Sequence, residues 1–287
     1  MKIREPYLPS GWYPGKKAEI ADFLKPFPLK HFPVRDASAP AVNTVAAPHA
    51  GWHYSGTLAA MALSSLDPDT ETIAVIGGHL PRGRPFLAAA EDGVKTPLGT
   101  MMMDNELREE LGKHAPFQSD QYQDNTVETL LPMVHFYFPN IRLLWLRFPA
   151  DISSFDAGKS LYKSAETLGR RLSVIASADL THYGANFSFS PKGSGKTALD
   201  WVRDVNDRAL IDAVISDDPA LVLRRAEEDR STCSAGAILG AMGFASRPDS
   251  QGCPQKARLL DYRTSADTAP MNNIPDSFVG YAAMLWE

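Results

Sequence analysis

The stretch Thr72-Ile73-Ala74-Val75-Ile76-Gly77-Gly78-His79 shows the pattern that decides the fold of this chain. Its apolar, partly β-branched run has the length of a buried strand, and it ends in two glycines and a histidine. Two other apolar runs lead into Pro48-His49-Ala50-Gly51 and into Ser177-Ala178-Asp179-Leu180-Thr181-His182-Tyr183-Gly184. Because open α/β sheets keep their chemistry at the carboxyl ends of strands, we expect these histidines to converge at one edge of a sheet.

Extended runs alternate with helical ones, which predicts an α/β protein whose central, largely parallel or mixed sheet is covered by helices on both faces. No internal repeat or low-complexity linker interrupts the pattern. The predicted strands are Val42–Ala47, Thr72–Ile76, Phe86–Ala90, Ile141–Arg147, Leu172–Ala176, Ala257–Tyr262 and Phe278–Leu285. The predicted helices are Leu58–Ser65, Asn105–His114, Thr126–Tyr137, Phe155–Arg171, Thr197–Ile215, Pro219–Glu228 and Cys233–Ala245.

Composition narrows the class of function. The chain has 287 residues, 44% of them hydrophobic, and a net charge of −5 with scattered basic residues. This charge pattern argues against nucleic acid and anionic membranes as partners. The start lacks the apolar segment of a signal peptide, and no apolar run approaches the roughly 18 residues of a membrane span, so we expect a cytoplasmic protein. Two cysteines in so long a chain do not indicate a disulfide framework.

Three residues are candidate metal ligands. His49 and His79 each follow a strand-like run and stand beside small residues that let an ion approach the backbone. Cys233 follows Ser231 and Thr232, either of which is expected to cap a helix that begins at the cysteine, where amide dipoles favour the thiolate. The alternative for Cys233 is a small buried apolar residue on a Gly/Ala-rich helix. Cys253 has no such support.

Asp179 and His182 are candidate catalytic residues. They lie three positions apart in a loop that ends in glycine, so the carboxylate either orients the imidazole or faces a common pocket with it. Such a pair suits a general acid or base beside a metal, whereas the structural alternative is a capping Asp with a hydrogen-bonded His. Glu128 is either a carboxylate behind the metal ligands or a first-turn residue favoured by the helix dipole.

Several motifs in series resemble the Memo family, also called AmmeMemoRadiSam system protein B. The resemblance runs from about Gly11 to Tyr281, in that family's order. Its motifs are Gly11-Trp12-Tyr13-Pro14, Pro48–Gly56, Thr96-Pro97-Leu98-Gly99, Glu128 with Leu131-Pro132, Asp179–Gly184, Cys233 and Ser277–Ala282.

The resemblance implies a single Memo-like α/β domain over residues 1–287, similar to the class III extradiol dioxygenases, which use non-haem Fe(II). It implies one metal ion held by His49, His79 and Cys233, with Asp179 and His182 lining the pocket. Fe(II) is favoured, and the softer His₂Cys set also suits copper or zinc. A radical-SAM protein and an AMMECR1-domain protein are implied as partners by the family name.

Three functions agree with this resemblance. The preferred one is a metal-dependent redox enzyme of the dioxygenase type. The second is a module that binds a phosphopeptide or another ligand in the same pocket without catalysis. The third is a metal-assisted hydrolase, because zinc-bound water beside a histidine base would serve it.

The chain departs from the family pattern around this pocket. The usual Gly-Pro-Ser-His is shortened to Gly77-Gly78-His79, the usual Glu-His-Ser is Asp124-Asn125-Thr126, and the usual Cys-Gly is Cys233-Ser234. Asn125 thus stands where the family has a pocket histidine. These changes leave open whether the activity is kept, altered or lost.

Overall fold

The computed structural model describes residues 1–29, 42–246, 255–268 and 274–287, and its strands form one mixed sheet. The order across the sheet is β1-β5-β6-β8-β3-β9-β2-β12-β10. Outside this order, β11 pairs with β12, β4 pairs with β8, and β7 pairs with β4. The strands are β1 Ile3–Arg4, β2 Thr44–Ala47, β3 Thr72–Leu80, β4 Phe86–Ala88, β5 Gly93–Thr96, β6 Gly99–Met103, β7 Phe117–Ser119, β8 Arg142–Pro149, β9 Leu172–Ser177, β10 His182–Gly184, β11 Ala257–Thr264 and β12 Ser277–Trp286.

The centre of the sheet is parallel. Strands β6, β8, β3, β9 and β2 run in one direction, and β12 pairs with β2 antiparallel. Ala47 pairs with Ser177, and Ile76 pairs with Ala176, so the carboxyl ends of β2, β3 and β9 lie side by side. His49, the end of β3 with His79, and the segment that leads from β9 to His182 therefore lie at one edge of the sheet, as the strand-end pattern predicts.

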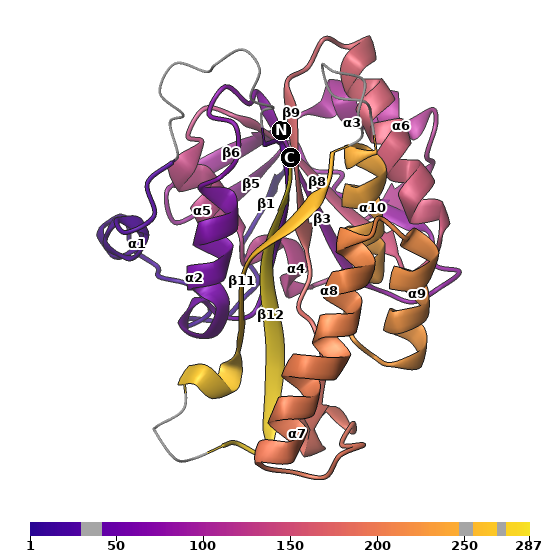
Figure 1. Cartoon of the computed structure of the whole chain (residues 1–287). Coiled ribbons are helices and arrows are strands. Elements are labelled where there is room, and N and C mark those ends of the chain that lie inside the picture. Colours follow the sequence, from indigo (N-terminus) through magenta and orange to yellow (C-terminus); the bar gives the residue numbers. More distant parts are fainter. Residues whose placement is uncertain (30–41, 247–254, 269–273) are drawn as a thin grey trace.

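Successive residues of the central strands face opposite sides of the sheet, as the two-residue period of a strand requires. In β3, Ile73 and Val75 pack in the core shared with helices α2 and α5, whereas Ala74 and Ile76 pack in the core shared with α6 and α10. Figure 1 shows α2 and α5 on one side of the sheet and α6 and α10 on the other. The expectation of an α/β fold with helices on both faces is confirmed.

The helices extend beyond the predicted set. Helix α1, Lys17–Leu24, was not expected, and α2 begins six residues before the predicted start. The bounds are α2 Trp52–Leu63, α3 Asn105–Gly112, α4 Asn125–Glu128, α5 Leu131–Tyr137, α6 Ser153–Thr167, α7 Lys196–Trp201, α8 Asp207–Ile215, α9 Pro219–Glu228 and α10 Ala235–Ala245, with a π-helical turn over Val202–Asn206.

The prediction of one helix over Thr126–Tyr137 is wrong. The segment forms two helices, α4 and α5, separated at Thr129 and Leu130. Pro132 has no N–H to donate to the carbonyl of Glu128, and the Leu130 N–H donates to the Val127 carbonyl oxygen, three positions back, so the helix ladder stops there. The break matters because α4 carries residues that contact the strand ends.

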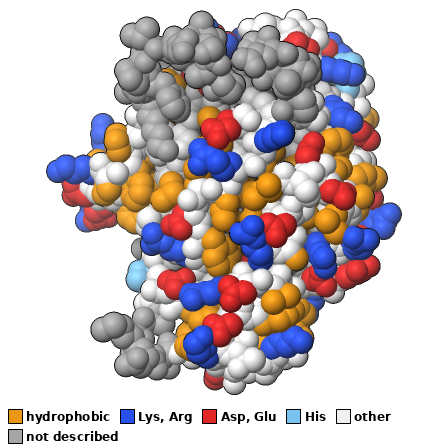
Figure 2. Space-filling view, in the orientation of Figure 1, with side chains coloured by type: hydrophobic (Ala, Val, Ile, Leu, Met, Phe, Trp, Pro, Cys, Tyr) orange, Lys and Arg blue, Asp and Glu red, His pale blue; other side chains and the backbone are white. Residues whose placement is uncertain are grey.

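Figure 2 shows acidic and basic side chains interspersed over the visible face, with no field of one sign. Within the described ranges, every helix is too short or too polar to cross a membrane.

Candidate metal centre

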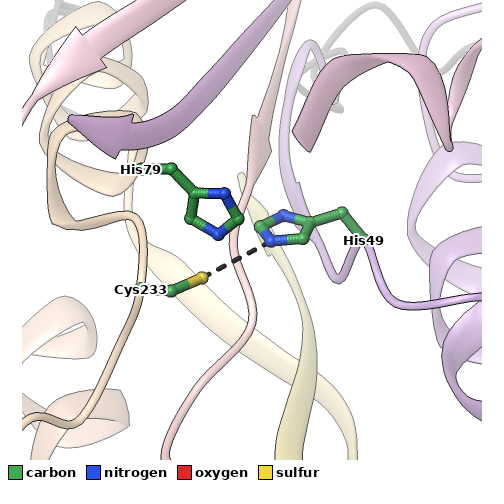
Figure 3. Close-up of side chains that lie close together, drawn as sticks. All are labelled: His49, His79 and Cys233. Atoms are coloured by element: carbon green, nitrogen blue, oxygen red, sulfur yellow. Dashed lines mark hydrogen bonds between the residues drawn. The ribbon is translucent and has the colours of Figure 1, made fainter. Parts of the chain in front are cut away.

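Three side chains from distant parts of the sequence meet at the carboxyl edge of the sheet. His49 follows β2, His79 lies near the end of β3, and Cys233 precedes α10. One ligand atom from each lies within 4.8 Å of the other two. Figure 3 shows the two imidazole rings and the sulfur turned toward a common point. The three sequence candidates are therefore neighbours in space.

His49 is held by buried neutral partners. Its side chain is 1% exposed, and its Nδ1 lies 3.0 Å from Ser177 Oγ. The Ser177 hydroxyl donates its proton to the Thr126 carbonyl oxygen, so its oxygen accepts from Nδ1–H of His49. The other ring nitrogen, Nε2, then keeps its lone pair and lies 3.4 Å from Cys233 Sγ.

His79 is held by a carboxylate. Its backbone has a φ of 57°, where β3 shifts register between Gly77 and Leu80. This left-handed conformation is uncommon outside glycine and turns the side chain out of the regular strand alternation. Nδ1 lies 2.9 Å from Asp124 Oδ2, which again leaves Nε2 for the centre.

Arg147 anchors Asp124 from behind. Its guanidinium donates to Asp124 Oδ2 at 3.2 Å and to the Gly78 carbonyl oxygen at 3.0 Å, and it also pairs with the buried Asp120. Burial opposes the charged form of Asp124, but His79, Thr126 and Arg147 together hold its pKa well below the usual range. A fixed carboxylate behind an imidazole sets both the tautomer and the ring orientation.

Opposing effects set the pKa values of the two histidines. Burial disfavours the imidazolium of His79, yet the hydrogen bonds to Asp124 and Cys233 and their charges raise its pKa to about 10. Burial acts in the same way on His49, and the charges of Asp179 and Cys233 raise its pKa overall. Without an ion, protons on these rings compensate the negative charges of the centre.

Cys233 is half-buried and carries the negative charge of the cluster. Burial opposes the thiolate, but the charges and hydrogen bonds of His49 and His79 hold the pKa of Cys233 well below its usual range. The expected helix start at Cys233 is wrong, because α10 begins at Ala235 with Ser234 as its N-cap. Thr232 Oγ1 and the Cys233 N–H both donate to the Asp179 carbonyl oxygen, so this segment is tied to the loop after β9.

Asp179 faces His49 rather than His182. Its Oδ1 accepts the His49 backbone N–H at 2.7 Å, and Oδ2 lies 3.8 Å from His49 Nε2. No hydrogen bond joins Asp179 to His182 in the described ranges; His182 Nδ1 instead lies 3.1 Å from the Leu180 carbonyl oxygen. Burial and the charge of Cys233 raise the pKa of the Asp179 carboxyl, while His49 and His182 lower it. The imidazole rings of both histidines therefore lie within electrostatic range of Asp179.

Asp207 anchors the loop that carries these two residues. Its Oδ1 accepts from the Thr181 N–H at 3.0 Å and from the Thr181 hydroxyl, and Oδ2 accepts from the Tyr262 hydroxyl at 2.7 Å. Burial raises the pKa of Asp207 to about 6 despite these bonds and the charge of His182. Asp207 follows the π-helical turn, an irregularity that often marks functional regions.

Glu128 and Asn125 act on the backbone near the centre. The Glu128 carboxylate accepts from the N–H groups of Tyr7 and Leu8 and from the Tyr13 hydroxyl, so it holds the N-terminal segment. Asn125, which stands where the resemblance implies a histidine, donates from Nδ2 to the His49 carbonyl oxygen at 3.2 Å.

A cavity of about 410 Å³ is lined by His53, Tyr54, Phe187, Phe278 and Tyr281 among others, and Phe187 connects it to His182. The Phe187 ring packs edge-on against the His182 ring, with centroids 4.9 Å apart. Burial and the charges of Asp179, Tyr54 and Cys233 raise the pKa of Tyr281, so this ring lies within electrostatic range of the cluster.

Sequence reasoning missed Ser177, Asp124 and Arg147 as partners of the two histidines. One signal was available: Arg147 is the charged residue inside the apolar run Leu143–Phe148, and a charge there needs a buried partner. No comparable signal marks Ser177, because a serine at a strand end is common. Cys253 lies outside the described residues.

Comparisons with known proteins agree with the motif series. A MEMO1 family protein of Desulfurococcus amylolyticus is 29% identical over 303 residues, which cover 99% of each chain. One from Archaeoglobus fulgidus is 27% identical over 290 residues, also with 99% of each chain covered. An uncharacterized protein from Escherichia coli K12 is a weak structural match, with a TM-score of 0.47 and 11% identity over 83% of this chain and 99% of that one. The family model described as "Memo-like protein" matches residues 4–285, and the chain therefore belongs to the Memo-like family.

Proposed function

We propose that His49, His79 and Cys233 hold one metal ion and that the protein is a non-haem metal-dependent redox enzyme. The observation that carries this proposal is the meeting of two imidazoles and a thiolate within 4.8 Å. Each imidazole has its far nitrogen bonded to an oxygen, on Ser177 or Asp124, and its near nitrogen free to act as a ligand.

The donor set fits a metal ion. Ligands at about 2.0–2.1 Å for nitrogen and about 2.3 Å for sulfur in a tetrahedral site lie roughly 3.5 Å from each other. The 3.4 Å between His49 Nε2 and Cys233 Sγ agrees with that spacing. The thiolate also compensates one positive charge, which a buried cation requires.

We favour Fe(II) among the candidate ions, with copper and zinc as the other two. Two imidazoles and one anionic ligand leave open coordination positions on the metal, as in the two-His-one-carboxylate iron sites. Thiolate is a softer ligand than carboxylate, so the set also suits copper and zinc. When bound, an iron or copper ion in this set supplies one-electron redox chemistry and an open position for a ligand.

His182 is the proposed general base. Its Nδ1–H donates to the Leu180 carbonyl oxygen, so Nε2 keeps a lone pair that can take a proton from a bound substrate. Phe187 holds the ring from one side and also lines the neighbouring cavity. Asp179 supports the centre by holding the backbone of His49 and by adding negative charge beside its ring.

The cavity supports an enzyme better than a phosphopeptide-binding module. Phosphate recognition typically uses clustered arginines, and among the described residues that line the cavity there is no Lys or Arg. Its aromatic and hydroxyl side chains suit an uncharged, partly apolar ligand.

Metal analysis tests the ligand set. Protein purified without oxygen should carry close to one ion per chain, and Cys233→Ala should lose most of it while the far-UV circular dichroism persists. Cys253→Ala serves as the matched control and should keep the ion. Full metal occupancy in Cys233→Ala would overturn the three-ligand proposal.

Oxygen uptake tests the redox activity and the base. Anaerobic Fe(II)-loaded protein is exposed to oxygen with catechol-like and thiol substrates, and His182→Ala should lower turnover on the order of 10²–10⁴-fold without removing the metal. His114→Ala, a change at an exposed histidine, is the control. No uptake with any metal and substrate, together with measurable phosphopeptide binding, would favour the binding module instead.

A further inference from the structure

Ser234 is the residue whose contacts the proposed function does not explain. It is the N-cap of α10, a position where a serine hydroxyl normally accepts a hydrogen bond from the first turn of the helix. Its side chain makes no such bond, although it is 1% exposed. Most buried hydroxyls have a hydrogen-bond partner, so we expect another one for Ser234.

That partner is the cysteine sulfur. Ser234 Oγ lies 3.3 Å from Cys233 Sγ, and this is its one side-chain hydrogen bond within the described ranges. The missing side chain of Gly78 makes the room, because a Cβ on Gly78 would overlap both Oγ and Cβ of Ser234. The backbone of β3 at Gly78 thus packs directly against Ser234 and keeps its hydroxyl next to the Cys233 sulfur.

The direction of this bond follows from the other contacts of the sulfur. A metal-bound cysteine is a thiolate, which accepts hydrogen bonds and donates none. With an ion in place, His49 Nε2 is a ligand, and the Asp179 carbonyl oxygen, 3.6 Å from Sγ, has no proton to give. Among these contacts of the sulfur, Ser234 is then the remaining donor.

We propose that the Ser234 hydroxyl donates a hydrogen bond to the metal-bound thiolate of Cys233 and thereby sets the electron-donating strength of that ligand. The inference rests on the proposed metal site and deepens it. A hydrogen bond withdraws electron density from sulfur, so the thiolate stabilises the higher oxidation state of the metal less, and the reduction potential rises. Ser234 is in this sense a tuning residue that touches the ligand and not the substrate.

Two measurements on metal-loaded protein test the inference. In the Co(II)-loaded chain, Ser234→Ala should move the thiolate-to-metal charge-transfer band to lower energy, because the sulfur becomes the better electron donor. In the copper-loaded chain, the ratio of Cu(I) to Cu(II) affinity should fall about tenfold, which is about 59 mV for a one-electron couple. Ser234→Gly, which a helix N-cap tolerates, should give both shifts if the Ala variant folds poorly.

Ser231→Ala is the matched control. Ser231 is also buried and stands two positions before the cysteine, and its hydroxyl has no hydrogen-bond partner in the described part of the chain. Its loss should leave the band and the potential unchanged.

The outcomes separate this inference from the proposed function. If wild-type protein gives no cobalt–thiolate band, both the metal site and the role of Ser234 are overturned. If the band is present but Ser234→Ala and Ser234→Gly leave it and the copper potential unchanged, the metal site stands and the hydrogen bond does not tune it. An equal shift in Ser231→Ala would also overturn the inference, because loss of any nearby hydroxyl would then suffice.

Discussion

The two histidines of the centre resemble each other in sequence and differ in their support. Both stand at the carboxyl end of an apolar strand of the same sheet, yet the His49 side chain is 1% exposed and that of His79 is 31% exposed. His49 is oriented by the neutral hydroxyl of Ser177, and His79 by the carboxylate of Asp124 with Arg147 behind it. The more exposed ring has the charged partner.

Energetics explain this difference. A neutral hydrogen bond contributes about 0.5–1.5 kcal/mol net and one to a charged group about 1.5–3 kcal/mol. His49 is already confined by burial, so a weak bond fixes its tautomer. His79 stands at a left-handed backbone position, which costs on the order of 1 kcal/mol, and one side of its ring meets solvent. We infer that it needs the stronger partner to keep one orientation.

Removal of either ring should have the largest effect. His49→Ala and His79→Ala should each weaken metal binding by more than the 10–100-fold that loss of an outer partner costs. His49→Ala should also lower the free energy of unfolding more than His79→Ala does, because it opens a buried cavity, whereas His79 is partly exposed. Competition with a chelator and urea unfolding measure the two quantities. Near wild-type affinity in His79→Ala would remove it from the ligand set.

Asp207 supports His49 indirectly. It accepts a hydrogen bond from Thr181, in the loop that carries Asp179, and Asp179 accepts the backbone N–H of His49. Burial raises the pKa of Asp207 to about 6 from 3.8, so the folded state binds more protons than the unfolded state between these values. The stability that this group contributes is full below about pH 3.8 and is lost as pH rises through about 6.

Asp207→Asn should remove that dependence. The unfolding free energy of wild type minus that of Asp207→Asn should fall on the order of 3 kcal/mol between about pH 4 and pH 7. Urea unfolding of both proteins across this range gives the difference. A pH-independent difference would show that Asp207 does not carry the raised pKa.

Asp124→Asn tests the charged support of His79. The two donors of Thr126 should keep the oxygen of the new amide at the Oδ1 position. Its NH₂ then replaces Oδ2, where it faces His79 and breaks the bond that Oδ2 accepts from Arg147. Nδ1 of His79 must then accept, which puts the proton on the nitrogen that faces the metal. We expect about 10–100-fold weaker metal binding, measured by chelator competition. Unchanged affinity would mean that His79 binds through another orientation.

Ser177→Ala should have the smallest effect. It removes a neutral acceptor from a ring that burial already confines, so we expect at most about tenfold weaker metal binding. The same chelator competition measures it. If Ser177→Ala weakens binding more than Asp124→Asn does, the contrast between the two histidines is wrong.

The strand ends were predictable from local sequence. Apolar runs that end one to five residues before a histidine predicted β2, β3 and β9 and their shared edge, because burial on both faces of a parallel sheet demands such runs. Short strands such as β1 and β7 were missed, since two or three residues carry no period. The helix break at Thr129 and the start of α10 at Ala235 were missed as well.

By itself, the sequence determined which residues could be ligands and which strands carry them, because side-chain type and hydrophobic periodicity are local properties. Only the tertiary structure decided how those residues are held. Ser177 is 128 positions from His49 in the chain, and Asp124 is 45 positions from His79. Ser234 is next to its partner, Cys233. Even the last contact depends on a distant residue, Gly78, whose bare backbone leaves room for the hydroxyl. Hydrogen bonds act over about 3 Å of space whatever the sequence separation, so the direction of a lone pair is fixed only when the chain has folded.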